Sequence, residues 1–231
     1  MLLPLLRGGN SGKLSGETMG HAVWQELIQE LLNAPYQFGV MEHGSPDYRV
    51  GFDAGLTNDE LASCEQRFGF RFPPDLREFL QAGLPCGPQF PDWRSGDEAS
   101  LREWLDLPRR GVLFDVEHNG FWLDEWGNKP ETLAAAVEAA SARVLAAPKL
   151  IPVFSHRMMP DEPHLPGNPI FSIHQTDIIH YGFNLSDYLR HEFGLPGRDE
   201  WPEAPRVIRF WDVDRFQSVR WAQGPREPDS I

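Results

Sequence analysis

The sequence predicts an α+β fold, a class in which helices and mostly antiparallel strands occupy separate blocks of the chain. Helical patterns dominate residues 21–83, strand-like patterns dominate residues 111–126 and 150–174, and the two kinds do not alternate as they do in βαβ units. The 231 residues, of which 41% are hydrophobic and 12% aromatic, suffice for one packed core. We therefore expect a single domain over residues 21–196, preceded by a flexible leader of residues 1–20.

The first part of the domain predicts three helices. Apolar residues recur at helical spacing over residues 21–34, at Val23, Trp24, Leu27, Ile28, Leu31 and Leu32. Residues 57–60 have the pattern of a capping box that begins a second helix, and Gly69 is a typical residue to end it. The residues Pro73-Pro74-Asp75 predict the start of a third helix.

The middle of the chain predicts a β-hairpin between two helices. A helix is expected over residues 98–107. The dipeptide Asn119-Gly120 then separates two apolar runs, residues 111–117 and 121–126, and Asn-Gly between such runs is a strong hairpin signal. An alanine-rich helix is expected from Pro130 to about residue 147.

The last part predicts two more strands and one more helix. The strands are residues 150–155 and 170–174, joined by a proline-rich loop, and the helix is residues 185–193. Residues 197–231 are interpreted as an acidic, proline-rich extension with one strand-like piece at residues 207–211.

Composition excludes several classes of function. The formal net charge is 21 − 34 = −13, which argues against binding a nucleic-acid backbone. No apolar run approaches the ~20 residues of a membrane span, and the first residues do not form a signal peptide. Cys64 and Cys86 are too few for a disulfide framework, so we expect reduced thiols in the cytoplasm.

The familiar catalytic motifs are missing from the sequence. There is no GxGxxG, no Walker loop, no GxSxG and no HExxH. Pro85-Cys86 matches half of a deaminase zinc motif, but Gln89 stands where the second cysteine belongs. We expect no catalytic residues and no cofactor.

Five of the eight histidines lie close together in the sequence, at His156, His164, His174, His180 and His191. If residues 170–180 were one strand, His174 and His180 would lie about 20 Å apart, too far for one ion. A turn at residues 175–177 would bring them closer, so a metal site stays open as an alternative. We expect structural and exposed histidines, with no metal.

Residues 92–125 combine acidic and aromatic side chains. They hold nine acidic residues against four arginines, interleaved with Trp93, Trp104, Trp122 and Trp126. One interpretation is a partner-binding surface that includes Asp97, Glu98, Glu103, Asp106, Asp115 and Glu117, because surface charges steer association and exposed aromatics anchor it. The other is that the tryptophans belong to the core and the acidic residues only solvate the surface.

Several segments in order are similar to the SUKH superfamily, and to its Smi/Knr family in particular. The segment ELASCEQRFGFRFPPDLREFLQAG, which begins at Glu60, resembles the opening helix pair of that superfamily. The similarity continues through residues 90–94, 120–127, 151–157, 160, 167–173, 176–182, 185, 187–189 and 192–193. It covers about residues 21–195, with a looser fit before residue 57.

The resemblance implies a central, mostly antiparallel sheet flanked by helices and no catalytic activity. Bacterial members are thought to be immunity proteins that neutralise cognate toxins of polymorphic toxin systems, and fungal members resemble signalling hubs. The motif residues are interpreted as architecture, and Arg157 and Asp177 as a pair. These motif residues are Trp122, Trp126, Gly127, His156, Arg157, Asn168, Ser172, Asp177, Tyr181 and Gly182.

The leading hypothesis is therefore a cytoplasmic bacterial immunity protein that binds a basic toxin domain, with no nucleic-acid or membrane partner. Two alternatives stay open. One is a regulatory or scaffold protein of the same family without a toxin partner. The other is a metal-assisted hydrolase that uses the region from His156 to His180.

Overall fold

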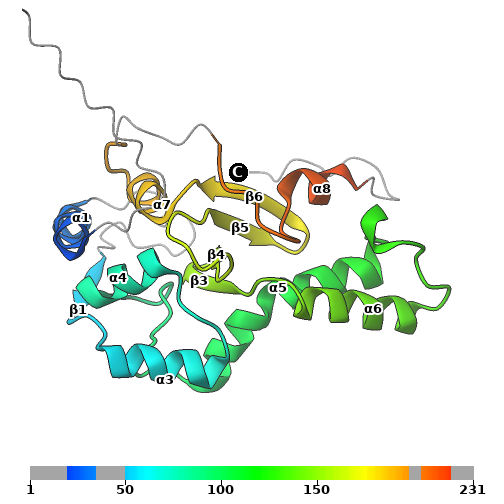
Figure 1. The fold of residues 1–231 in the computed structure, drawn as a ribbon, viewed down its shortest axis with the longest axis horizontal. Helices are drawn as coiled ribbons and strands as arrows, with labels where there is room; N and C mark the ends of the chain where they lie inside the picture. Colours follow the sequence, from blue (N-terminus) through cyan, green and yellow to red (C-terminus); the bar gives the residue numbers. More distant parts are fainter. Residues whose placement is uncertain (1–19, 35–49, 198–203, 220–231) are drawn as a thin grey trace, which may run out of the picture.

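The computed structural model describes residues 20–34, 50–197 and 204–219, and it has the predicted α+β fold (Figure 1). The helices of this part are α1 (His21–Asn33), α3 (Asn58–Phe68), α4 (Pro74–Ala82), α5 (Glu98–His118), α6 (Leu133–Leu145), α7 (Leu185–Glu192) and α8 (Val213–Ser218), with a short 3₁₀ helix η1 (Asp124–Trp126). Within the described ranges, no helix combines the length and the apolar character needed to cross a membrane.

A four-stranded antiparallel sheet forms the middle of the molecule. Its strands are β3 (Leu150–Phe154), β4 (Arg157–Pro160), β5 (Ile170–His174) and β6 (Asp177–Gly182), in the order β3-β4-β5-β6. The sequence predicts β3 and β5 correctly, but β4 lies in the segment for which it predicts a proline-rich loop. A second, two-stranded sheet pairs β1 (Gly51–Asp53) with β2 (Leu84–Cys86).

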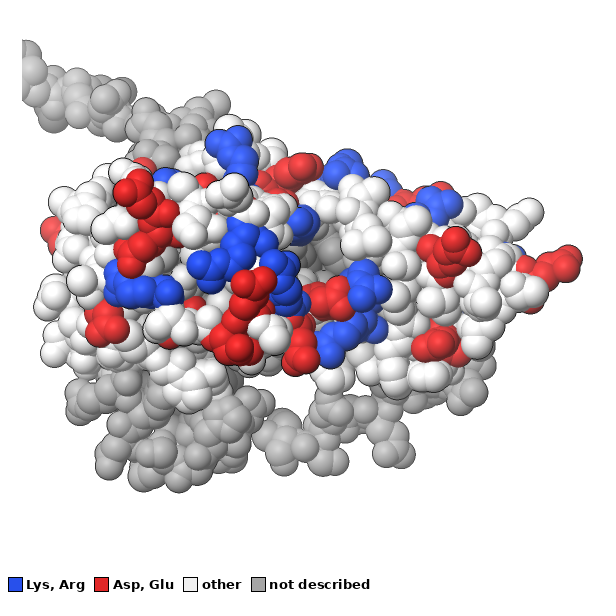
Figure 2. Space-filling view, turned by 90° about the horizontal axis from the view of Figure 1, so that it is seen from below, with Lys and Arg blue, Asp and Glu red and all other residues white. Residues whose placement is uncertain are grey.

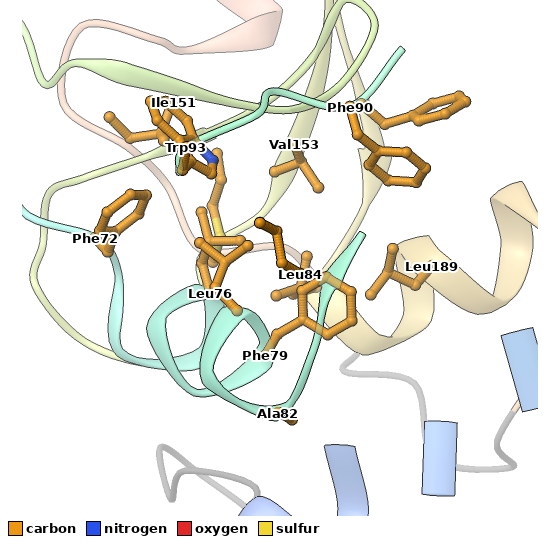
Figure 3. Packing of buried hydrophobic residues seen from close by; sticks show 14 of the residues in the cluster. Phe72, Leu76, Phe79, Ala82, Leu84, Phe90, Trp93, Ile151, Val153 and Leu189 are labelled. Carbon is orange, nitrogen blue, oxygen red and sulfur yellow. The ribbon is translucent and has the colours of Figure 1, made fainter. Parts of the chain in front are cut away.

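The two faces of the four-stranded sheet bury two separate hydrophobic clusters, because side chains alternate along each strand. One face contributes Ile151, Met159 and Ile170 to a cluster that includes residues of α1, α3, α4 and α7. Figure 3 shows Leu76 and Phe79 of α4 and Leu189 of α7 gathered near Val153 of β3. The other face contributes Leu150, Met158, Phe171 and Ile173 to a cluster that includes residues of α5, α6 and α8. The sheet is therefore a central layer between two groups of helices.

Local capping signals predicted α3 and α4 correctly. The Thr57 hydroxyl accepts the Glu60 N–H at 3.2 Å, and the Glu60 carboxylate accepts the Thr57 N–H at 2.7 Å, so the capping box is present. Gly69 ends α3 in the left-handed conformation with φ of 68°. Pro74 is the first residue of α4.

The predicted hairpin at Asn119-Gly120 is wrong. Residues 111–117 continue α5, and residues 121–126 form a loop and η1. Val112 and Val116, four residues apart, are buried on one face of the helix, whereas Phe114 between them is 42% exposed. This burial has helical spacing, so Asn119-Gly120 ends a helix instead of joining two strands.

The predicted strand at residues 207–211 is also wrong. Phe210 has φ of 73°, which interrupts an extended chain, and the described strands do not include this segment. The segment instead leads into α8, whose start is capped by the Asp212 carboxylate. Ile208, Trp211 and Phe216 are buried in the second hydrophobic cluster, so residues 204–219 contribute to the core.

Candidate functional site

The acidic stretch 92–125 divides into two parts with different charge. All four of its arginines lie before residue 111, and several of them neutralise nearby carboxylates. Arg102 pairs with Glu98 at 2.7 Å, and Arg109 pairs with Asp106 at 2.6 Å. Figure 2 shows basic and acidic side chains interleaved over the middle of the lower face of the molecule. The first half of the stretch is therefore nearly balanced in charge.

The individual site residues of this stretch lie in different environments. Asp97 caps α5 and accepts the Ser100 N–H at 2.9 Å. Glu103 and Glu117 are exposed on α5. Asp115 is 0% exposed, so its assignment to a partner-binding surface is wrong. The assignment assumed a solvated strand face, whereas Asp115 lies on the buried side of a helix.

The tryptophans of the stretch are mostly structural, as the second interpretation held. Trp93 and Trp126 are buried in the core. Trp104 is half-buried and donates its indole N–H to the Ser155 carbonyl at 2.8 Å. Trp122 is half-buried and donates to the Gly127 carbonyl at 2.7 Å.

The second half of the stretch belongs to what we call the distal surface. Here the end of α5, η1 with the loop after it, the β5–β6 turn and α8 come together, and α8 lies beside the β5–β6 hairpin (Figure 1). The acidic residues of the distal surface are Glu117, Asp124, Glu125, Glu131, Asp177, Asp212 and Asp214. Its basic residues are Lys129, Arg215 and, from the adjoining helix α6, Arg143, which donates to the Trp126 carbonyl at 2.7 Å. Seven negative and three positive charges give 3 − 7 = −4, so this end has an excess of negative charge, compared with −13 for the whole chain.

A cluster of aromatic rings supports the distal surface from beneath. Phe121 lies 5.7 Å from Trp126 and 5.5 Å from Phe216, measured between ring centroids. Phe210 lies 6.1 Å from Trp126 and 4.8 Å from Trp211. Contacts between aromatic rings stabilise the fold beyond the effect of the apolar area that the rings bury. The cluster therefore holds α8 against η1.

A pocket of about 580 Å³ opens in the distal surface between η1 and the end of α8. Its lining includes Trp122, Asp124, Glu125, Arg215 and Ser218. The guanidinium of Arg215 contacts the Glu125 carboxylate. The pocket therefore combines an aromatic wall with the carboxylates of η1 and the Arg215 guanidinium of α8.

His180 lies where the sheet meets α8. Burial lowers the pKa of His180 from its usual value, and the nearby carboxylates of Asp214 and Asp212 act in the opposite direction. The ring packs against Phe171, with the two centroids 5.2 Å apart. His180 is therefore interpreted as a structural residue that packs between β6 and α8.

The histidines do not converge on a common point. The turn at residues 175–177 exists, because β5 and β6 form a hairpin, but His174 pairs with Asp177 while His180 pairs with Phe171. Three rungs separate these pairs, so His174 and His180 lie on opposite faces of the sheet, about 10 Å apart along it. In the part of the chain that the structure describes, no group of three or more His, Cys, Asp or Glu side chains is arranged to hold a metal ion.

One group of motif residues forms a polar cluster between β4, β6 and α7. Arg157 lies 3.5 Å from the Glu192 carboxylate and donates to the Ser172 hydroxyl at 2.9 Å. Its guanidinium carbon lies 3.7 Å from the centroid of the Tyr181 ring. His156 adjoins Arg157 in the β3–β4 turn. These contacts agree with an architectural role.

The other motif residues also make close contacts within the fold. Asn168 is fully buried and donates to the carbonyls of Pro160 and Pro163 at 3.0 and 2.9 Å. A Cβ atom on Gly182 would lie 2.5 Å from Cβ of Tyr188, so the packing of α7 requires glycine there. Asp177 is exposed at the start of β6, and its pairing with Arg157 stays a prediction.

Sequence reasoning missed the α8 part of the distal surface, namely Asp212, Asp214 and Arg215. Asp212 was a detectable signal, because Asp is a favoured helix N-cap and its carboxylate accepts the Arg215 N–H at 3.2 Å. Comparisons of the chain with protein-family models, curated proteins and solved structures found no match.

Proposed function

We propose that this chain is a non-enzymatic protein-binding domain that binds a basic protein partner through its distal surface. More specifically, we propose a cytoplasmic bacterial immunity protein that neutralises a basic toxin domain. The observation that carries the proposal is the concentration of acidic charge around the Trp122 pocket. The proposal assigns no catalytic residue, no cofactor, and no nucleic-acid or membrane partner.

The distal surface has the two features that a binding surface for a basic protein needs. Its carboxylates attract a basic partner over several ångströms and accelerate the encounter. Trp122 at the pocket wall offers an aromatic face, on which a lysine or arginine side chain gains a cation–π interaction. Aromatic residues at pockets of this kind are typical anchors of protein interfaces.

The first half of α5 is a weaker candidate for the same role. The carboxylates of Glu98 and Asp106 already pair with arginines of the same helix, and Asp97 is used as a helix cap. A partner would have to displace these contacts before it could gain from the charges. This region, which the sequence predicts to be part of the binding surface, therefore supplies the control variant in the binding experiment below.

The resemblance to the SUKH superfamily supports the choice of partner class. In this chain most of the motif residues contact other parts of the fold, as Arg157, Asn168 and Gly182 do. Asp212 and Asp214 of the distal surface lie outside the similar segments. Asp212 caps α8 and pairs with Arg215 at 3.2 Å, whereas Asp214 is exposed and can match one particular partner.

The test begins with identification of the partner by co-purification with the full chain. Association rates are then measured at low and high salt for two triple variants with the same change of charge. Glu117→Lys, Asp124→Lys and Asp214→Lys reverse the distal surface, whereas Asp97→Lys, Glu98→Lys and Glu103→Lys reverse the first half of α5. We expect the distal variant to associate roughly 10-fold more slowly at low salt, with little difference at high salt, because exposed charges are screened.

Two outcomes would contradict parts of the proposal. If the α5 variant is slowed and the distal variant is not, the binding surface lies on the first half of α5. The immunity role has its own test, in which the chain is co-produced with the toxic domain of its partner. Protection of the host cells supports that role, and a partner without toxicity indicates the regulatory alternative.

A further inference from the structure

Residues 161–168, between β4 and β5, cross from the sheet to α4 and are held mainly by polar contacts. We call this segment the strap. At its start, the Asp161 carboxylate accepts the Lys149 N–H at 2.8 Å, and the Asp161 N–H donates to the Lys149 carbonyl at 2.9 Å. Near its end, the Asp75 carboxylate of α4 accepts the Gly167 N–H at 2.9 Å. One carboxyl group therefore fixes each end of the strap.

None of the apolar side chains of the strap is fully buried. Leu165, the only leucine of the strap, is 53% exposed, and Glu162 and Pro163 are exposed as well. Asn168 continues the polar anchoring, since its side-chain oxygen accepts a hydrogen bond from Arg206 at 2.6 Å. The strap thus joins α4, on one side of the sheet, to the segment that leads into α8.

We propose that the strap is a pH-responsive element, which the carboxyl groups of Asp75 and Asp161 hold closed in mild acid and release more readily as the pH rises. The proposal is independent of the function proposed above, because it uses none of the charged residues of the distal surface. It rests on the position of the two carboxyl groups at the two ends of the same segment.

The environment of each carboxyl group gives the direction of the effect. Burial raises the pKa of Asp75 from 3.8 to about 6, although the Gly167 and Leu76 N–H groups and the charge of Arg206 act against it. Burial also raises the pKa of Asp161 from 3.8 to about 6; Glu162 adds to the shift, and the N–H and charge of Lys149 oppose it. Arg209 lies 3.4 Å from the Glu162 carboxylate, so its positive charge opposes the effect of Glu162 on the pKa of Asp161.

When the strap opens, both carboxyl groups meet water and their pKa values return to the ordinary range. The closed state therefore binds more protons than the open state between about pH 4 and pH 6, and acid favours closure. The pKa of each carboxyl group differs by about two units between the closed and the open state. Each group therefore lowers the equilibrium constant for opening about 10-fold when the pH falls from 7 to 5. Acting together, the two groups lower it about 100-fold.

His164, in the middle of the strap, acts with the opposite sign. Burial lowers its pKa, as do the charges of Arg71 and Arg77, whereas Glu65 raises it. Protonation of this ring in acid thus favours opening and offsets part of the carboxyl effect. Replacement by a neutral side chain in His164→Gln should make the pH dependence steeper.

The experiment is amide hydrogen exchange of the full chain at pH 5, 6, 7 and 8, with rates divided by the intrinsic rates of an unstructured chain. In the regime where exchange follows the opening equilibrium, protection of the Asp161 and Gly167 amides reports closure of the strap. We expect their protection to rise 10- to 100-fold from pH 7 to pH 5. Equal or lower protection at pH 5 would overturn the proposal.

Two amide variants separate the carboxyl effect from general changes in stability. Asp75→Asn and Asp161→Asn keep a hydrogen-bond acceptor for the strap but remove the titrating group. Each variant should therefore reduce the rise in amide protection from pH 7 to pH 5 about 10-fold. Asp92→Asn, in the loop before α5, is the matched control and should leave the dependence unchanged. A carbon-13 titration of the carboxyl groups in the unaltered protein needs no variant; midpoints near pH 4 at both residues would also overturn the proposal.

Discussion

The buried carboxylate of Asp115, near the end of α5, holds the β5–β6 turn through Thr176. One carboxylate oxygen accepts the Thr176 N–H at 2.9 Å and also the Thr176 hydroxyl, while the other accepts from the Asn119 side chain. Backbone and side chain at position 176 are therefore both satisfied by a single residue 61 positions earlier. This contact fixes the hairpin against the helix and helps to shape the distal surface.

Loss of this carboxylate should destabilise the whole domain. Asp115→Ala leaves the N–H and hydroxyl of Thr176 buried without their acceptor, which we expect to lower the free energy of unfolding by about 2–4 kcal/mol. Urea unfolding followed by tryptophan fluorescence measures the change. Glu117→Ala, at an exposed position two residues further along α5, should change the free energy of unfolding by less than about 0.5 kcal/mol. Equal losses in the two variants would show that the Thr176 contacts contribute little.

A second prediction concerns the close approach of β6 to α7. In Gly182→Ala the new methyl group would lie 2.5 Å from Cβ of Tyr188 and 2.9 Å from its Cα, so strand or helix must shift. We expect a loss of about 1–3 kcal/mol, as for other overpacked sites. Gly20→Ala is the control, because nothing lies within 4 Å of the added carbon there. Thermal unfolding of both variants checks the difference.

The parts of the fold that the sequence predicted well are those with local signals. The Thr57 capping box and Gly69 are short-range features, and they mark α3 wherever the helix packs. Residues 111–117 carry no such signal, because their apolar run suits a strand as well as a buried helix. Packing decided the outcome, since Val112 and Val116 lie in one cluster with Ala136 and Ala140 of α6.

The candidate site was only half predictable for a related reason. The acidic and aromatic residues up to Glu125 are visible in the sequence as a stretch, and part of that stretch does form the distal surface. An arginine on the same helix can neutralise a carboxylate, as Arg109 does for Asp106 three residues before it. The stretch of acidic residues alone therefore does not show which carboxylates keep their charge available. The return of α8 to η1 is a tertiary contact, seen in the Arg215–Glu125 pair across 90 positions, and nothing in the local sequence indicates it.

A third prediction concerns acid stability. Hydrogen bonding to Arg94, followed by that to Thr57, lowers the pKa of Glu60 from 4.5 to about 2. A folded-state pKa below the unfolded value means that this group stabilises the fold above about pH 4.5 and loses its contribution as the pH falls toward 2. The difference in urea midpoint between the unaltered protein and Glu60→Gln should therefore shrink from pH 6 to pH 2.5. Glu103→Gln, an exposed position on α5, serves as the control; a difference for Glu60→Gln that stays constant with pH would contradict the assignment.

The last prediction tests whether the segment before α8 is part of the folded core. Trp211 is 2% exposed, packs among the aromatic rings beneath the distal surface, and donates its indole N–H to the Pro148 carbonyl at 2.7 Å. We expect Trp211→Ala to lower the free energy of unfolding by about 3–5 kcal/mol, as large-to-small core substitutions do. Trp211→Phe keeps most of the ring and loses the hydrogen bond, so the part of the loss due to the bond should be about 1 kcal/mol.

Val207→Ala provides the control within the same segment, because Val207 is 78% exposed. It should change stability by less than about 0.5 kcal/mol. Urea unfolding of the three variants measures these values, and amide exchange in α6 shows whether the effect spreads, since Ala136 and Ala140 share the hydrophobic cluster with Trp211. If Trp211→Ala unfolds at the same urea concentration as Val207→Ala, the packing of residues 204–219 does not stabilise the domain. The α8 side of the pocket beside Trp122 would then not be held in place by the core.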